Sequence, residues 1–99
     1  MRRIVVTGMG AVSPLGASVE SSWSRVVAGQ SGLRRLPDDM VGDLAPKVGG
    51  VVRTIQEDPE AGFDADRILA PKDQRKVDRF ILFALAAADE ALAQAGWRP

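Results

Sequence analysis

Residues 4–16 read IVVTGMGAVSPLG, a run of branched apolar side chains followed by a turn that contains three glycines. The consecutive residues Ile4, Val5 and Val6 are typical of a β-strand buried on both faces, and Gly8 ends the run. A glycine-rich turn directly after a strand can cradle a phosphate. The stretch therefore raises the question of whether the protein binds a nucleotide.

The glycine turn fails the two phosphate-binding patterns that begin in this way. A dinucleotide fingerprint has the spacing G-x-G-x-x-G immediately before a helix, but here Gly8 and Gly10 are followed by Ser13 in place of a third glycine. Pro14 interrupts the point where that helix would begin. A P-loop is excluded because the chain has no Gly-Lys-Ser/Thr triplet. We therefore predict a tight strand-to-helix turn whose glycines let the backbone run close to neighbouring elements.

The overall charge does not indicate binding to a highly charged partner such as nucleic acid or a membrane surface. The chain has 13 basic and 13 acidic residues and a formal net charge of zero, so no global field attracts nucleic acid or a membrane surface. The longest apolar stretch, residues 80–88, is too short to span a bilayer, and the N-terminus lacks the apolar core of a signal peptide. We predict a cytoplasmic protein that binds neither nucleic acid nor membrane.

The residue types that are absent limit the chemistry. The chain contains no cysteine and no histidine, which excludes a thiol nucleophile, a Ser-His-Asp triad and the usual zinc ligands. Ser13 beside Pro14 is interpreted as turn chemistry, and Asp64 and Asp66 are too sparse a set of carboxylates for a metal site. We predict that these residues hold no catalytic side chain, no metal and no cofactor.

Two helices are predicted from apolar residues that recur with the 3.6-residue period. The first follows Ser18 as N-cap and stops at Gly29, and Trp23 on its apolar face is expected in the core. The second and longer helix runs from Val77, with Gly96 as its C-terminal cap. Both glycines suit helix ends because they adopt the left-handed conformation without a steric penalty.

The middle of the chain is less regular. Residues 30–46 are predicted to form an irregular connection, because glycine, proline and aspartate interrupt them. Residues 47–55 (KVGGVVRTI) are predicted to be a strand with a bulge or a close backbone approach at the paired glycines. Residues 56–62 are expected to form an acidic turn, and residues 63–70 one short helical turn before Pro71.

Three blocks of the sequence resemble the β-ketoacyl-acyl-carrier-protein synthases of type II. RRIVVTGMGAVSPLG is similar to the opening of that family, SVESSWSRVVAGQSGLRRL to the helix and loop that follow, and PKDQRKVDRFILFALAAADEALAQAGW to its next long helix. The resemblance covers most of the chain and is weakest over residues 36–62. It implies an α/β chain that is the N-terminal part of a thiolase-like layered α/β/α/β/α fold, so we predict one incomplete domain over residues 1–99.

The resemblance also implies a function for the full-length protein. Such synthases are cytoplasmic homodimers that elongate acyl chains on acyl-carrier protein, by decarboxylative condensation with malonyl-carrier protein in fatty-acid synthesis. The family's cysteine nucleophile and two histidines have no counterpart here and are expected beyond Pro99. The alternative is a non-catalytic ketosynthase-like partner subunit or carrier-protein-binding module, which would lack them. The chain offers only one predicted partner strand, which would leave the edges of a strand over Ile4–Val6 open, so we predict that the isolated chain is marginally stable or prone to aggregation.

A basic cluster is the candidate binding site. Lys72, Arg75, Lys76 and Arg79 recur at i, i+3, i+4 and i+7, which on one helix would form a positive ridge facing solvent. The spacing alone fits a solvated helix face with scattered ion pairs. The resemblance implies more, because KDQRK matches the segment that meets the acidic helix of acyl-carrier protein in the family. We therefore predict Lys72, Arg75 and Lys76 as docking residues and leave Arg79 out.

Overall fold

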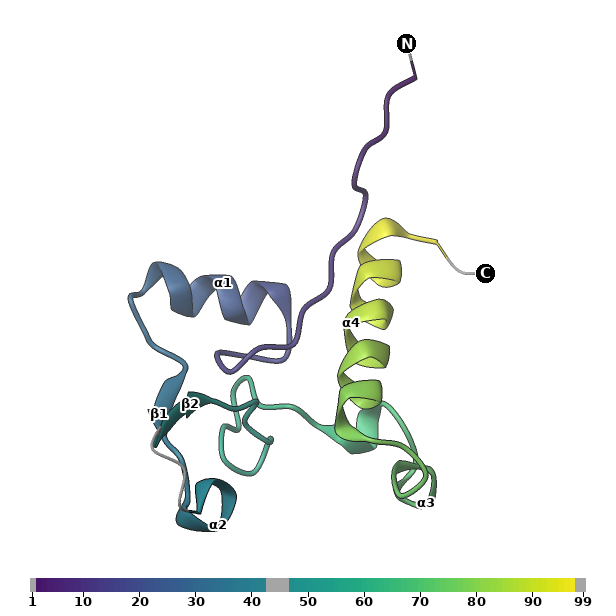
Figure 1. The fold of residues 1–99 in the computed structure, drawn as a ribbon. Helices are drawn as coiled ribbons and strands as arrows, with labels where there is room; N and C mark the ends of the chain where they lie inside the picture. Colours follow the sequence, from purple (N-terminus) through teal and green to yellow (C-terminus); the bar gives the residue numbers. More distant parts are fainter. Residues whose placement is uncertain (1, 43–46, 98–99) are drawn as a thin grey trace.

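The computed structural model describes residues 2–42 and 47–97, and its elements alternate between helix and short strand (Figure 1). In chain order they are α1 (Val19–Val27), β1 (Leu33–Arg35), α2 (Asp38–Val41), β2 (Val48–Gly50), the 3₁₀ helix η1 (Ala65–Arg67), α3 (Pro71–Gln74) and α4 (Arg79–Ala95). β1 and β2 form a two-stranded antiparallel sheet with Arg34 opposite Gly49. No helix among the described residues combines the length and apolarity needed to cross a membrane.

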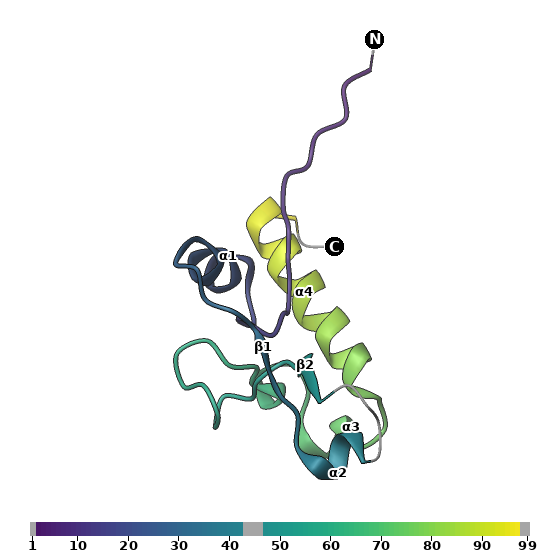
Figure 2. The same cartoon turned by 60° about the vertical axis from the view of Figure 1, so that its left-hand side comes forward.

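The N-terminal strand predicted over Ile4–Val6 does not form. The segment projects past the C-terminal end of α4 (Figures 1 and 2), and its side chains are 93%, 73% and 78% exposed. A strand buried on both faces needs neighbouring strands for its N–H and C=O groups and layers to cover it. Within residues 2–42 and 47–97 no strand pairs with it. The apolar side chains of Ile4–Val6 therefore form a surface that no strand or helix of the described residues covers.

Helix α1 begins and ends where its capping residues predict. The Ser18 hydroxyl accepts a hydrogen bond from the Ser21 amide, and Gly29 follows the helix with φ of 78°. The prediction that Trp23 lies in the core is wrong for this chain, since the residue is 66% exposed. Val27 on the same helix is 68% exposed, so this face of α1 lacks a covering layer.

The connection predicted as irregular contains part of the only sheet in the described residues. β1 and α2 lie within residues 30–42, whereas residues 43–46 of that connection are outside the described part of the chain. The strand predicted over 47–55 shortens to β2. The neighbours of its glycines are side chains and not the predicted close backbone: a Cβ on Gly49 would lie 3.0 Å from Leu36 Cδ1, and one on Gly50 would lie 3.0 Å from Pro14 Cγ.

The small core lies where α4 meets the segment before η1. Phe63 and Leu82 are buried, and the Phe63 ring meets the Phe83 ring edge-on with centroids 4.9 Å apart. The predicted turn over 56–62 and the helical turn before Pro71, which is η1, are both confirmed. Gly96 caps α4 with φ of 72°, as predicted.

A bidentate ion pair ties α1 to the acidic turn. Arg25 Nη1 donates to Asp58 Oδ2 at 2.5 Å and to the Leu15 carbonyl at 2.8 Å, while Nη2 donates to Asp58 Oδ1 at 3.1 Å. Asp58 also accepts from the Ala61 amide. The hydrogen bond from Arg25 is the main cause that lowers the pKa of Asp58 from 3.8 to about 2.

Asp58 should make the unfolding free energy fall as the pH is lowered in the acid range. Because its pKa is lower in the folded chain, its contribution is fully present above pH 3.8 and disappears as the pH falls through about 2. We expect Asp58→Asn to flatten the loss of unfolding free energy in this window, measured by urea titration of the full-length protein. The control is Glu60→Gln, because Glu60 is 91% exposed and 3.9 Å from Arg25. If the unfolding free energy falls equally steeply with decreasing pH in wild type and in Asp58→Asn, the prediction is contradicted.

Candidate docking surface

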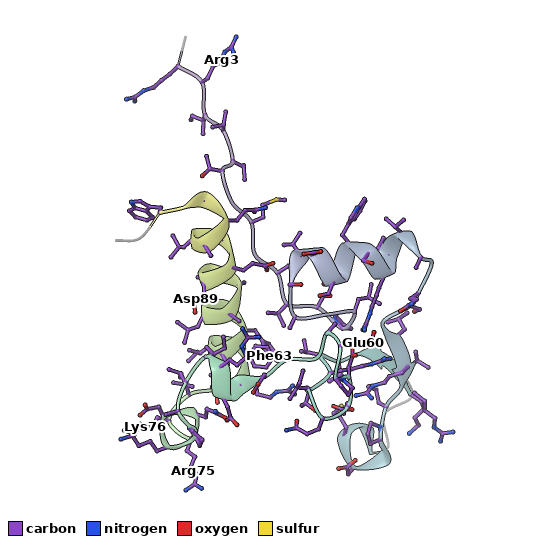
Figure 3. The ribbon with its side chains drawn as sticks, turned by 180° about the vertical axis from the view of Figure 1, so that it is seen from behind. Arg3, Glu60, Phe63, Arg75, Lys76 and Asp89 are labelled. Atoms are coloured by element: carbon purple, nitrogen blue, oxygen red, sulfur yellow. The ribbon has the colours of Figure 1, made fainter. Side chains whose placement is uncertain are left out.

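The three predicted docking residues lie on and just after the short helix α3. Lys72 is inside α3, Arg75 is its C-cap and Lys76 is in the turn that follows. All three residues are exposed. Figure 3 shows Arg75 and Lys76 extending outward from this turn. The structure thus brings the three predicted cations together in one exposed segment.

The predicted continuous ridge is wrong, because the segment is two helices and not one. α3 ends at Gln74, and Asp78 is extended, with φ of −77° and ψ of 160°, before α4 begins at Arg79. Asp78 occupies the N-cap position, although its side chain makes no capping hydrogen bond, and the helix predicted from Val77 starts two residues later. Lys72 and Arg79 therefore belong to different helices.

Arg79 is attached to the body of the protein. Its guanidinium lies over the Phe83 ring, 5.1 Å from the centroid, and its Nη2 donates to the Val52 carbonyl at 3.5 Å. The other three cations are less constrained. Lys76 Nζ is 3.7 Å from Asp73 Oδ1 in an exposed pair that contributes little to stability. In the described part of the chain, the side chains of Lys72 and Arg75 have no ion pair or hydrogen bond, so their charges remain available to a partner.

One uncharged side chain fixes α3 against the preceding 3₁₀ helix. Gln74 Nε2 donates to the Leu69 carbonyl at 2.9 Å and to Asp66 Oδ1 at 2.7 Å. Asp64 in turn accepts from the Asp66 amide, so both aspartates act as hydrogen-bond acceptors. Sequence reasoning missed Gln74, since no local pattern distinguishes it from any polar residue on a helix. Its contacts give the cationic segment a defined backbone.

A cavity of about 380 Å³ lies beside this segment. Its lining includes Thr54, Asp66, Gln74, Arg79 and Phe83. A general base or nucleophile of the cysteine or histidine type is not available in this sequence. The segment can offer charge and shape to a partner.

The glycine turn is confirmed as a close-packing device. A Cβ at Gly8 would overlap the carbonyl oxygen of Ala91, and one at Gly10 would overlap that of Ala87. The glycines thus let the N-terminal segment lie against the backbone of α4. Ser13 performs the predicted turn chemistry: its Oγ accepts from the Leu15 amide at 3.2 Å and the Gly16 amide at 3.3 Å.

Comparison with known proteins gives a consistent set of relatives. The family described as β-ketoacyl synthase, N-terminal domain, matches residues 1–99. The chain is 46% identical over 99 residues to a 3-oxoacyl-[acyl-carrier-protein] synthase 2 of Rhizobium meliloti, covering 100% of this chain and 23% of the relative. It is 40% identical over 95 residues to the protein of that name in Vibrio cholerae, covering 96% and 21%. A mitochondrial 3-oxoacyl-[acyl-carrier-protein] synthase of Arabidopsis thaliana is 38% identical over 112 residues, covering 99% and 23%. The chain therefore spans less than a quarter of the length of these curated relatives.

Proposed function

This chain belongs to the β-ketoacyl synthase family, and on that premise we propose that it is the N-terminal part of an enzyme that elongates acyl chains on acyl-carrier protein. The reaction is a decarboxylative condensation in fatty-acid biosynthesis. Malonyl-carrier protein loses carbon dioxide, and its α-carbon attacks the carbonyl carbon of the acyl thioester. The bond from that carbon to sulfur breaks, so that the thiol leaves and a β-ketoacyl-carrier protein is formed. The observation that carries the proposal is the family match over all 99 residues. The cysteine and histidines that perform the chemistry would lie in the rest of the polypeptide.

Lys72, Arg75 and Lys76 would dock the acyl-carrier protein. Three observations support this docking role: the three side chains are exposed, they form no strong ion pair among the described residues, and Gln74 fixes the backbone of the segment. An acidic partner surface would be attracted by this positive segment before contact, which raises the association rate and makes it sensitive to salt.

The rest of the polypeptide would complete the fold. A thiolase-like layered architecture would provide strands beside Ile4–Val6 and a layer over the α1 face that includes Trp23, both of which are exposed in this chain. We expect the full-length enzyme to be a cytoplasmic homodimer. The exposure of these large apolar side chains supports a covering layer, because burying them against it would be favourable.

A reconstitution assay tests the proposed activity. The full-length protein is incubated with acyl-carrier protein bearing an acyl chain and with malonyl-carrier protein, and mass spectrometry follows the products. We expect β-ketoacyl-carrier protein, and none from the 99-residue chain alone, which lacks cysteine and histidine. A folded full-length protein that binds carrier protein but forms no product would support the non-catalytic partner subunit instead.

A further inference from the structure

The carboxylate of Glu90 lies where the glycine segment meets the N-terminus of α1. Glu90 Oε1 accepts from the Ala11 amide at 3.0 Å and from the Val19 amide at 3.2 Å, and Oε2 accepts from the Val19 amide at 2.9 Å. Val19 is the first residue of α1. One acidic side chain of α4 therefore binds the backbone of two segments that lie about 70 to 80 residues away in sequence.

The position suits an anion on physical grounds. The first amides of a helix have no partner within the helix, and the helix dipole makes this end positive. Ser18 satisfies the Ser21 amide, and Glu90 satisfies that of Val19. In dinucleotide-binding proteins the phosphates occupy the corresponding place, between a glycine turn and a helix N-terminus. Here a carboxylate of the chain itself occupies it.

A second side chain of α4 also accepts a hydrogen bond from a backbone amide of the glycine segment. Gln94 Oε1 accepts from the Met9 amide at 2.7 Å. Glu90 and Gln94 are four residues apart, a rise of about 6 Å along the helix, and Met9 and Ala11 are two residues apart in an extended backbone, about 6.6 Å. The two spacings are close enough for α4 to bind alternate amides of the extended segment, in the way a neighbouring strand would.

We propose that Glu90 is a built-in anion that fixes the glycine segment to the N-terminus of α1 and occupies the place that a phosphate takes in nucleotide-binding proteins. Glu90 is thus a positioning residue, and it acts through the amides of Ala11 and Val19. The inference does not rest on the condensation activity. It predicts that a small carboxylate in solution can replace the Glu90 side chain once that side chain is removed.

Chemical rescue in the full-length protein tests the role. Glu90→Ala should lower the thermal midpoint, and sodium formate should restore a large part of the loss relative to sodium chloride at the same ionic strength. Formate should have no such effect on wild type or on Asp89→Ala. Asp89 is the matched control because it is the neighbouring carboxylate on α4, exposed, and without a hydrogen bond in the part of the chain that the structure describes (Figure 3).

Two outcomes would overturn the proposal. One is a thermal midpoint for Glu90→Ala equal to that of Asp89→Ala, and the other is a formate effect that is the same in all three proteins. If Glu90→Ala does not fold, Glu90→Gln keeps the size and one acceptor oxygen but removes the charge. Hydrogen exchange at Ala11 and Val19 should then be at least about tenfold faster than in wild type, because hydrogen bonds to charged groups are the stronger ones. Unchanged protection of both amides in Glu90→Gln would equally reject the role.

Discussion

Replacement of Arg75 and Lys76 by glutamate in the full-length protein is expected to raise the KM for carrier-protein-linked substrate at least about tenfold, because like charges placed across an interface cost several kcal/mol. Turnover of a short acyl-CoA analogue should stay nearly unchanged, since that substrate has no acidic protein surface. Both side chains are exposed, and of these two cations only Lys76 forms an ion pair among the described residues, with Asp73. Steady-state kinetics with the two substrates measure the difference.

The control uses another exposed arginine. Arg35→Glu reverses one charge, half the change in the double variant, on β1, which lies apart from α3 (Figure 1). It should leave the KM for carrier-linked substrate within about twofold of wild type, as expected for a charge outside the interface. Added salt should reduce the difference between wild type and the Arg75→Glu, Lys76→Glu variant, since exposed charges are screened. Equal losses with both substrates would mean that the variant damages the fold or the active site, and would reject the docking role.

Local signals in the sequence predicted the local structure. Ser18 and Gly29 define α1 because an N-cap hydroxyl and a left-handed glycine act within one helical turn. Gly96 ends α4 for the same reason. The start of α4 was also readable, since Asp78 stands directly before the apolar period, which is an N-cap signature. The helical spacing of the basic residues from Lys72 to Arg79 instead favoured one continuous helix where the structure has α3 and α4.

The non-local features could not be predicted in the same way. Ile4–Val6 has the pattern of a buried strand, but burial depends on partners from distant parts of a polypeptide. Trp23 likewise has helical spacing with apolar neighbours, which identifies a face but not what covers it. The roles of Gln74 and Glu90 depend on backbone groups that only the folded chain brings within reach.

A methyl group at Gly10 is expected to be the most destabilising small substitution in the glycine turn. In Gly10→Ala the new Cβ would overlap the Ala87 carbonyl oxygen and lie 2.6 Å from its carbonyl carbon. These are backbone atoms of a long helix, which cannot rotate away as a side chain would. We expect a loss of about 3 kcal/mol or more of unfolding free energy, at the upper end of the usual cost of overpacking. Urea titration of the full-length protein measures it.

Two further variants separate this clash from the general cost of replacing glycine. Gly29→Ala places its methyl in open space at φ of 78°, so it should cost only the left-handed backbone penalty of about 1–2 kcal/mol. Ala87→Gly should not rescue Gly10→Ala, because the overlap involves the Ala87 backbone and leaves its side chain uninvolved. Rescue by Ala87→Gly would mean that the segment packs against a side chain, and the close backbone approach that explains the glycines of this turn would then be wrong.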